Sequence, residues 1–70
     1  MDITFDRQAN ALYIKFRPGK RSARTVKLRD GLLIDVDRAG RLFGIEILDV
    51  SHRIPMAQLG HVTVNLPAHT

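Results

Sequence analysis

Residues 31–50 read GLLIDVDRAGRLFGIEILDV and contain two apolar runs separated by a short polar segment. Both runs are rich in β-branched and large apolar side chains, which favour strands because they pack well on a pleated surface. Between the runs, Asp37 suits the first position of a type I turn, since its carboxylate accepts hydrogen bonds from nearby backbone N–H groups. Gly40 suits the left-handed residue that closes such a turn with a bulge. The stretch therefore predicts a β-hairpin at the centre of the fold.

Neither run of this hairpin alternates cleanly between apolar and polar residues. Leu32, Leu33 and Ile34 are consecutive, and so are Leu42 and Phe43. Strands with apolar residues on both faces are covered on both faces. A chain of 70 residues has little material with which to cover a sheet twice. We therefore expect a second copy of the chain to supply the cover, in a homodimer or a higher homo-oligomer.

Length and composition narrow the class of protein. The chain has 70 residues and no cysteine, so we expect one small β-rich domain over 1–70 without disulfides or thiolate metal sites. Domains of this size bury only about 60% of their unfolded surface, so oligomerisation is a natural stabiliser. No apolar run approaches the roughly 18 residues of a membrane span, and the first residues do not have the pattern of a signal peptide. These features predict a cytoplasmic protein without a membrane partner.

The sequence before residue 31 contains three further strand patterns. Residues 3–5 and 11–17 read as a first hairpin, and the second of them alternates apolar and polar residues from Leu12 onward. Pro18-Gly19 opens a loop, after which residues 23–29 alternate again.

After residue 50 the pattern changes. Ser51 as an N-cap and Pro55 in a first helical turn predict one short helix within 51–60. Residues 61–66, HVTVNL, then alternate again and predict a last strand, at a sheet edge or across a dimer. The expected fold class is α+β and mostly β: consecutive antiparallel β-hairpins of five or six strands, with one short helix near the C-terminus.

Positive charge is concentrated in the first part of the chain. Residues 1–30 hold eight Lys or Arg and three Asp, a balance of +5, whereas residues 31–70 hold three Arg and four acids, a balance of −1. Seven cations lie in 15–29 without an acid among them: Lys15, Arg17, Lys20, Arg21, Arg24, Lys27 and Arg29. On two strands and their loop they could form a basic ribbon that contacts nucleic acid through its phosphates. The alternative is a solvated face that keeps edge strands from aggregating.

The acidic residues of the central hairpin leave two interpretations open. Asp35 and Asp37 share one strand face, as the carboxylates of a metal site or of an acid–base pair would. Carboxylates beside a turn more often serve the turn, and Asp35 and Glu46 also suit bonds to backbone, to Arg41 or to an arginine of another chain. The three histidines lack the spacing of metal ligands, and no serine lies in a nucleophile elbow. We therefore expect no metal, no cofactor, no catalytic residue and no enzymatic activity.

The order of several residues resembles a known family. Asp6 precedes Ala11-Leu12-Tyr13-Ile14, then come Asp30-Gly31 and Ile34-Asp35, and the most specific block is Gly44-Ile45-Glu46-Ile47-Leu48-Asp49, after Asp37 and Gly40. Over residues 2–50 the chain resembles the small prokaryotic proteins grouped as "domain of unknown function 2283". The resemblance implies a small β-rich protein with an antitoxin-like binding role at most, and it supplies no catalytic residue. Its structural motif falls on Asp35, Asp37, Gly40, Gly44, Ile45, Glu46 and Ile47.

Two hypotheses about function follow. The first is a cytoplasmic protein-interaction module that self-associates and, as the resemblance implies, neutralises a small partner protein. The second is a nucleic-acid-binding protein that uses the basic segment 15–29. The two are compatible in a protein that represses its own operon.

Overall fold

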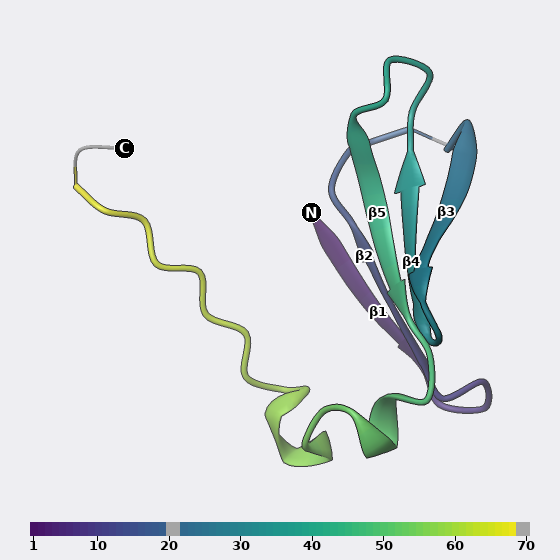
Figure 1. Cartoon of the computed structure of the whole chain (residues 1–70). Coiled ribbons are helices and arrows are strands. Elements are labelled where there is room, and N and C mark those ends of the chain that lie inside the picture. Colours follow the sequence, from purple (N-terminus) through teal and green to yellow (C-terminus); the bar gives the residue numbers. More distant parts are fainter. Residues whose placement is uncertain (20–21, 69–70) are drawn as a thin grey trace.

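The strands of the chain form one antiparallel sheet. The computed structural model describes residues 1–19 and 22–68. Its sheet has five strands in the order β1-β2-β5-β4-β3 (Figure 1). Every neighbouring pair is antiparallel, so the expected mostly β fold built from antiparallel hairpins is confirmed. The strands are β1 (Asp2–Asp6), β2 (Ala11–Lys15), β3 (Arg24–Arg29), β4 (Leu32–Val36) and β5 (Leu42–Ile47).

The hairpin predicted at the centre of the fold is formed by β4 and β5. The backbone N–H of Gly40 donates to the carbonyl oxygen of Asp37 at 3.0 Å, and the N–H of Asp37 donates to the carbonyl oxygen of Arg41 at 2.9 Å. Gly40 has a φ of 82°, the left-handed conformation that glycine adopts without steric cost. The predicted turn at Asp37 and its closing left-handed glycine are therefore both confirmed.

The register of the sheet gives it an apolar face and a polar face. Residues paired across neighbouring strands lie on the same face, and the face alternates along each strand. Ile3 pairs with Ile14, Ile14 with Ile45 and Ile45 with Ile34. The side of the sheet that these pairs define is called the apolar face, and it comprises Ile3, Phe5, Leu12, Ile14, Val26, Leu32, Ile34, Val36, Leu42, Phe43, Ile45 and Ile47.

The segment that follows β5 is anchored at the end of the sheet. The N–H of Val50 donates to the carbonyl oxygen of Asn10 at 3.1 Å, and the Asn10 amide exchanges two further hydrogen bonds with Ser51. The Arg53 guanidinium donates to the carbonyl oxygen of Asp30 at 2.8 Å. Residues 48–54, the clamp, thus join the β1–β2 turn to the β3–β4 turn, and Val50 is fully buried.

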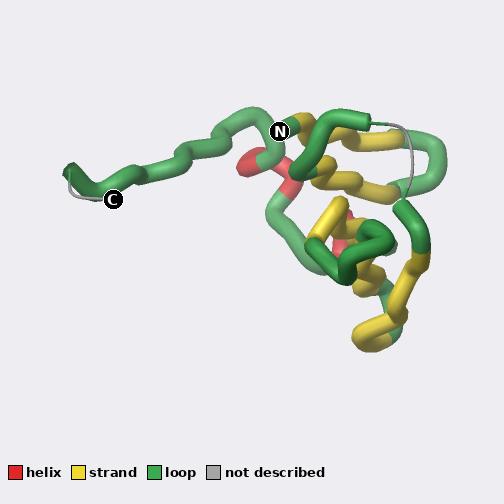
Figure 2. The backbone as a smooth tube through the Cα atoms, turned by 90° about the horizontal axis from the view of Figure 1, so that it is seen from above, coloured by secondary structure: helices red, strands yellow, loops and turns green. Residues whose placement is uncertain are grey.

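The C-terminal expectations need two corrections. In place of one short helix, the chain forms two 3-10 turns, η1 (Val50–His52) and η2 (Met56–Gln58). Ser51 does not cap the first turn: Asp49 stands at that position, because the Ser51 side chain is bonded to Asn10. The last strand expected over 61–66 is wrong for the single chain, since this segment pairs with no strand among the described residues. It extends away from the sheet (Figures 1 and 2).

Among residues 1–19 and 22–68, we find no helix with the length and apolar character needed to cross a membrane.

Candidate functional site

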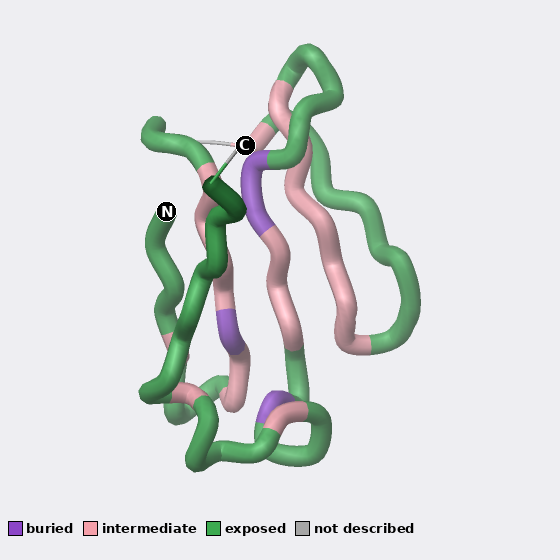
Figure 3. Tube along the Cα trace, turned by 90° about the vertical axis from the view of Figure 1, so that its left-hand side faces the viewer, coloured by how far each residue is buried: buried purple, intermediate pink, exposed green. Residues whose placement is uncertain are grey.

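The apolar face is unusual because many of its apolar side chains are exposed or only half-buried. Among the described residues, its buried members are Leu12 and Phe43, each 7% exposed. Ile3 and Val26, on the two edge strands, are 41% and 38% exposed. Figure 3 shows that buried positions are few and that the centre of the sheet is only half-buried. The two 3-10 turns lie beyond the end of the sheet, and no other described helix or strand lies across it (Figure 1).

The total exposed area of the chain is larger than that of a compact monomer of the same mass. The chain exposes 5788 Å², whereas a compact monomer of 7.9 kDa exposes about 4,400 Å². The excess is about 1,400 Å² for each chain, and the apolar face shares it with the extended, exposed segment 61–66. Two chains that each buried this excess would form an interface within the range of about 2,000–5,000 Å² that obligate homodimers have.

The polar face is held by a hydrogen-bond cluster across three strands. The Tyr13 hydroxyl donates to Asp35 Oδ2 at 2.7 Å, and the Thr25 hydroxyl donates to Asp35 Oδ1 at 2.5 Å. Burial of the Tyr13 phenol, together with the hydrogen bond to Asp35 and the charges of Asp35 and Glu46, raises the pKa of Tyr13 to about 12. Tyr13 therefore stays a neutral donor near neutral pH, and the cluster ties β2 and β3 to β4.

Gly44 makes room for the tyrosine of this cluster. A Cβ at position 44 would overlap Tyr13 Oη, would lie 2.6 Å from Tyr13 Cζ and 2.9 Å from the carbonyl oxygen of Ile14. A glycine inside a strand often marks such a close approach. The sequence analysis missed this cluster, although a glycine within the apolar run of β5 was the signal for it.

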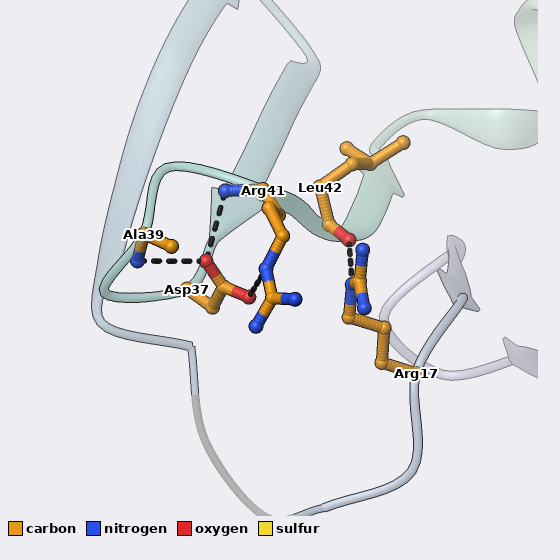
Figure 4. Close-up of polar contacts among 5 residues, drawn as sticks. All are labelled: Arg17, Asp37, Ala39, Arg41 and Leu42. Atoms are coloured by element: carbon orange, nitrogen blue, oxygen red, sulfur yellow. Dashed lines mark hydrogen bonds and ion pairs between the residues drawn. The ribbon is translucent and has the colours of Figure 1, made fainter.

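The two aspartates singled out as a metal or acid–base pair do not act together. Asp37 accepts hydrogen bonds from the backbone N–H groups of Ala39 at 2.9 Å and Arg41 at 2.8 Å, and from Arg41 Nε at 2.9 Å (Figure 4). These bonds, chiefly the one from the Arg41 backbone, hold the pKa of Asp37 below its usual value. Asp37 serves the turn, as the alternative interpretation had it, whereas Asp35 bonds to hydroxyls and not to Arg41. No group of three or more metal-ligand side chains occurs within the described part of the chain.

The basic segment does not form the two-stranded ribbon that we expected. Its strands, β2 and β3, are separated in the sheet by β5 and β4. Lys15 Nζ lies 5.8 Å from the centre of the Phe43 ring, and Arg17 Nε donates to the carbonyl oxygen of Leu42 at 3.0 Å (Figure 4). Lys27 pairs with Asp30 at 2.9 Å.

The remaining cations of the segment do not restore a ribbon. Arg24 and Arg29 pair with Val36 and Leu32, on the side of the apolar face, whereas Lys27 pairs with Leu33 on the polar side. Lys20 and Arg21 lie outside the described residues. Nucleic-acid binding by these side chains stays a prediction, without the ribbon geometry on which it depended.

The residues of the family-like motif divide between the two faces and the turn. Ile45 and Ile47 lie on the apolar face, and Glu46 pairs with Tyr13 on the polar face. Asp37 and Gly40 form the turn. The motif thus builds the central hairpin and contributes Ile45 and Ile47 to the apolar face.

Two open hollows lie at the ends of the hairpins. The larger, of about 580 Å³, is lined by Ser22, Ala23, Asp37, Arg38, Ala39 and Arg41. The smaller, of about 440 Å³, is lined by Lys27, Leu28, Arg29, Asp30 and Arg53. The acids in both already have cationic partners, so the apolar face remains the strongest candidate for an interaction surface.

Comparison with known proteins supports the family resemblance. A family model described as "Protein of unknown function (DUF2283)" matches residues 2–51, which is more than half of the chain. No curated protein and no solved structure gives a significant match. The matched range contains all five strands and ends within η1.

Proposed function

Because the chain belongs to the DUF2283 family of proteins of unknown function, we propose its function from its surface: it is a self-associating protein-interaction module. Two copies cover each other's apolar face. One observation carries the proposal, namely a continuous apolar face of the sheet that no described element covers. Burial of apolar surface contributes about 25 cal/mol for each Å² removed from water. Packing of a second copy on this face would therefore stabilise the dimer.

The size of the uncovered surface favours a copy of the same chain. Monomeric proteins rarely expose a contiguous apolar patch larger than a few hundred Å². The excess of about 1,400 Å² for each chain, which the apolar face and the exposed segment 61–66 share, suits a symmetric interface in which the same surfaces are buried twice. A cysteine-free β-rich module of this kind suits the reducing cytoplasm of a prokaryote.

Sedimentation velocity over a range of protein concentrations tests self-association. We expect the wild-type chain to sediment as a dimer or a larger homo-oligomer. Val26→Glu and Leu42→Glu place a charge on exposed members of the apolar face and should each weaken association by at least about 100-fold, since a buried charge without a partner is costly. Gln8→Glu, at an exposed position of the turn between β1 and β2, is the matched control and should leave association unchanged.

Circular dichroism separates loss of association from loss of folding in these variants. Folded Val26→Glu and Leu42→Glu chains that still associate like the wild type would show that another surface is used. A wild-type chain that stays monomeric at high concentration would overturn the proposal.

The antitoxin-like role adds a second partner to the same proposal. In this form the module also neutralises a small protein of its host. Purification of the tagged chain from its host at low salt, with identification of every bound molecule, tests it. A stoichiometric small protein supports this role, whereas nucleic acid that is released by salt supports the basic segment as a binding site. Recovery of the homo-oligomer alone contradicts both.

A further inference from the structure

We propose that residues 61–66 form a sixth strand on the sheet of a second copy, paired antiparallel with the edge strand β1 of that copy. The inference rests on the self-association proposed above and names the segment that joins the copies. The exchange is reciprocal, so each chain gives one strand and receives one.

The segment already has the character of a strand. Val62, Val64 and Leu66 alternate with His61, Thr63 and Asn65, the period of two that a half-buried strand has. Val62 and Val64 are 60% and 62% exposed. The last backbone hydrogen bond before it runs from the N–H of His61 to the carbonyl oxygen of Gln58, at 3.0 Å. Beyond it, residues 62–66 make no hydrogen bond within the described parts of the chain.

Of the two sheet edges, β1 is the one suited to accept a strand. β1 pairs with β2 over five consecutive positions without a register shift. It contains no Lys or Arg, and it directs Ile3 and Phe5 to the apolar face. Regular edges of this kind are templates for strand addition.

The other edge, β3, carries features that block strand addition. Its register shifts between Lys27 and Arg29, and half of its six residues are Lys or Arg. Bulges and cationic side chains are the devices by which edge strands avoid pairing with another chain. We therefore assign the segment to β1.

Side-chain pattern then selects a register. With Thr63 opposite Thr4, the neighbouring pairs are Val62 with Phe5 and Val64 with Ile3, so the added strand extends the apolar face. A slip of one residue would turn both valines to the polar face. The selected register uses the whole of β1 and places His61 opposite Asp6.

A second copy accounts for the position of the segment better than the chain's own β1 does. The clamp fixes where the segment starts, and from there it runs away from its own sheet in both views (Figures 1 and 2). Pairing with a second copy also removes part of the excess exposed area from both chains. Reciprocal exchange gives a closed two-fold dimer, in which no strand edge of β1 remains open.

Disulfide cross-linking tests the pairing directly, because the natural chain has no cysteine. A chain with Thr4→Cys and a differently tagged chain with Thr63→Cys are mixed in denaturant, refolded together and oxidised. Residues directly opposite in neighbouring strands have Cβ atoms about 4.5–5.5 Å apart, close to the separation that a disulfide needs. Thr25→Cys on β3 replaces Thr4→Cys as the matched control, since both are exposed threonines of edge strands on the polar face.

Each outcome of the cross-linking decides the matter. A disulfide-linked pair of the two tagged chains in the Thr4→Cys mixture, and not in the Thr25→Cys mixture, is the expected result. Linkage through Thr25→Cys would assign the strand to β3. A single chain carrying both Thr4→Cys and Thr63→Cys should link between chains, and a bond within one chain would show that the segment folds back on its own sheet. Absence of any link would overturn the pairing.

Sedimentation separates failure of this inference from failure of the proposed function. A chain with Val62→Lys and Val64→Lys should associate at least about 100-fold more weakly than the wild type, since two valines no longer become buried. The control Thr63→Lys lies on the other side of the segment and should associate normally. If the double variant associates like the wild type while Val26→Glu does not, the apolar face is confirmed as an interface and the added strand is wrong. If the wild type is monomeric, both are wrong.

Discussion

Substitution of Gly44 by alanine tests whether the polar face is built as the structure indicates. Alanine inside a strand normally stabilises by roughly 0.5–1 kcal/mol relative to glycine, because less chain entropy is lost on folding. Here the new Cβ would overlap Tyr13 Oη and would lie 2.6 Å from Tyr13 Cζ. The ring must move, and the hydrogen bond of Tyr13 to the Asp35 carboxylate is then lost.

The magnitude follows from these contacts. A hydrogen bond to a charged group contributes about 1.5–3 kcal/mol. The new Cβ would also lie 2.9 Å from the backbone carbonyl oxygen of Ile14. This contact is relieved only if the strand shifts, and overpacking of this kind costs about 1–3 kcal/mol. Set against the entropic gain, Gly44→Ala should lower the free energy of unfolding by about 2–4 kcal/mol.

Urea unfolding followed by circular dichroism measures this effect, at one fixed protein concentration because the proposed self-association would contribute to stability. A double-mutant cycle identifies the cause. In a Tyr13→Val chain the ring is absent, so Gly44→Ala should cost at least about 2 kcal/mol less than it does in the wild type. If Gly44→Ala is neutral or stabilising in the wild-type chain, or costs the same in both chains, the account of this cluster is refuted.

Three further predictions concern the turns and the clamp. Asp37→Asn removes the carboxylate whose pKa the Arg41 and Ala39 bonds hold down. That group stabilises the fold above its unfolded pKa of about 4 and loses the contribution as pH falls through its folded pKa, so urea midpoints of wild type and variant should converge between pH 7 and pH 2. Gly31→Ala and Gly40→Ala should each cost about 1–2 kcal/mol, because both positions have φ above 80°. Gly31→Ala should cost more in thermal unfolding, since its Cβ would overlap the Arg53 guanidinium; equal losses would argue against the Arg53 contact. Val50→Ala removes buried methyl groups from a residue with no exposed area and should cost about 1–2 kcal/mol. A loss below about 0.5 kcal/mol would show that the clamp is not packed.

The hairpins could be predicted because their signals are local. The turn of Asp37 and Gly40 closes the central hairpin within a few residues, and the alternation from Leu12 onward marks β2 without reference to any other strand. Such signals identify strands and turns but do not order them in a sheet. β2 pairs with β5, more than 25 residues later in the chain, and no local pattern specifies that choice.

The contacts that depend on strand order were missed for the same reason. Tyr13 reaches Asp35 because β5 places Gly44 between their strands. The expectation that Asp35 and Asp37 share a function considered only their spacing along one strand, and the turn removes Asp37 from that strand face. The basic ribbon does not form, because two strands, β5 and β4, lie between the cations of β2 and those of β3.

The segment 61–66 has the sequence pattern of a strand, but the described part of the single chain offers it no strand to pair with. The alternation in 61–66 indicates a strand as clearly as that of β2 does, yet the single chain gives it no partner among the described residues. Apolar alternation has a physical purpose only if one side becomes buried. The apolar face also lacks a partner within the single chain, since its side chains are as apolar as those of a protein interior and no described element covers them.

These two features lie on different sides of the boundary of the family match. Residues 2–51 contain the sheet, the Tyr13 cluster, the Asp37–Gly40 turn and the buried Val50. The segment 61–66 lies beyond that range. The matched region therefore contains a sheet with one face to be covered, and in the proposed dimer the tail is the segment that reaches across to the other chain. If the tail is the joining strand, changes within it should alter the strength of association while the unfolding of the sheet itself, measured on the dissociated chain, stays nearly the same.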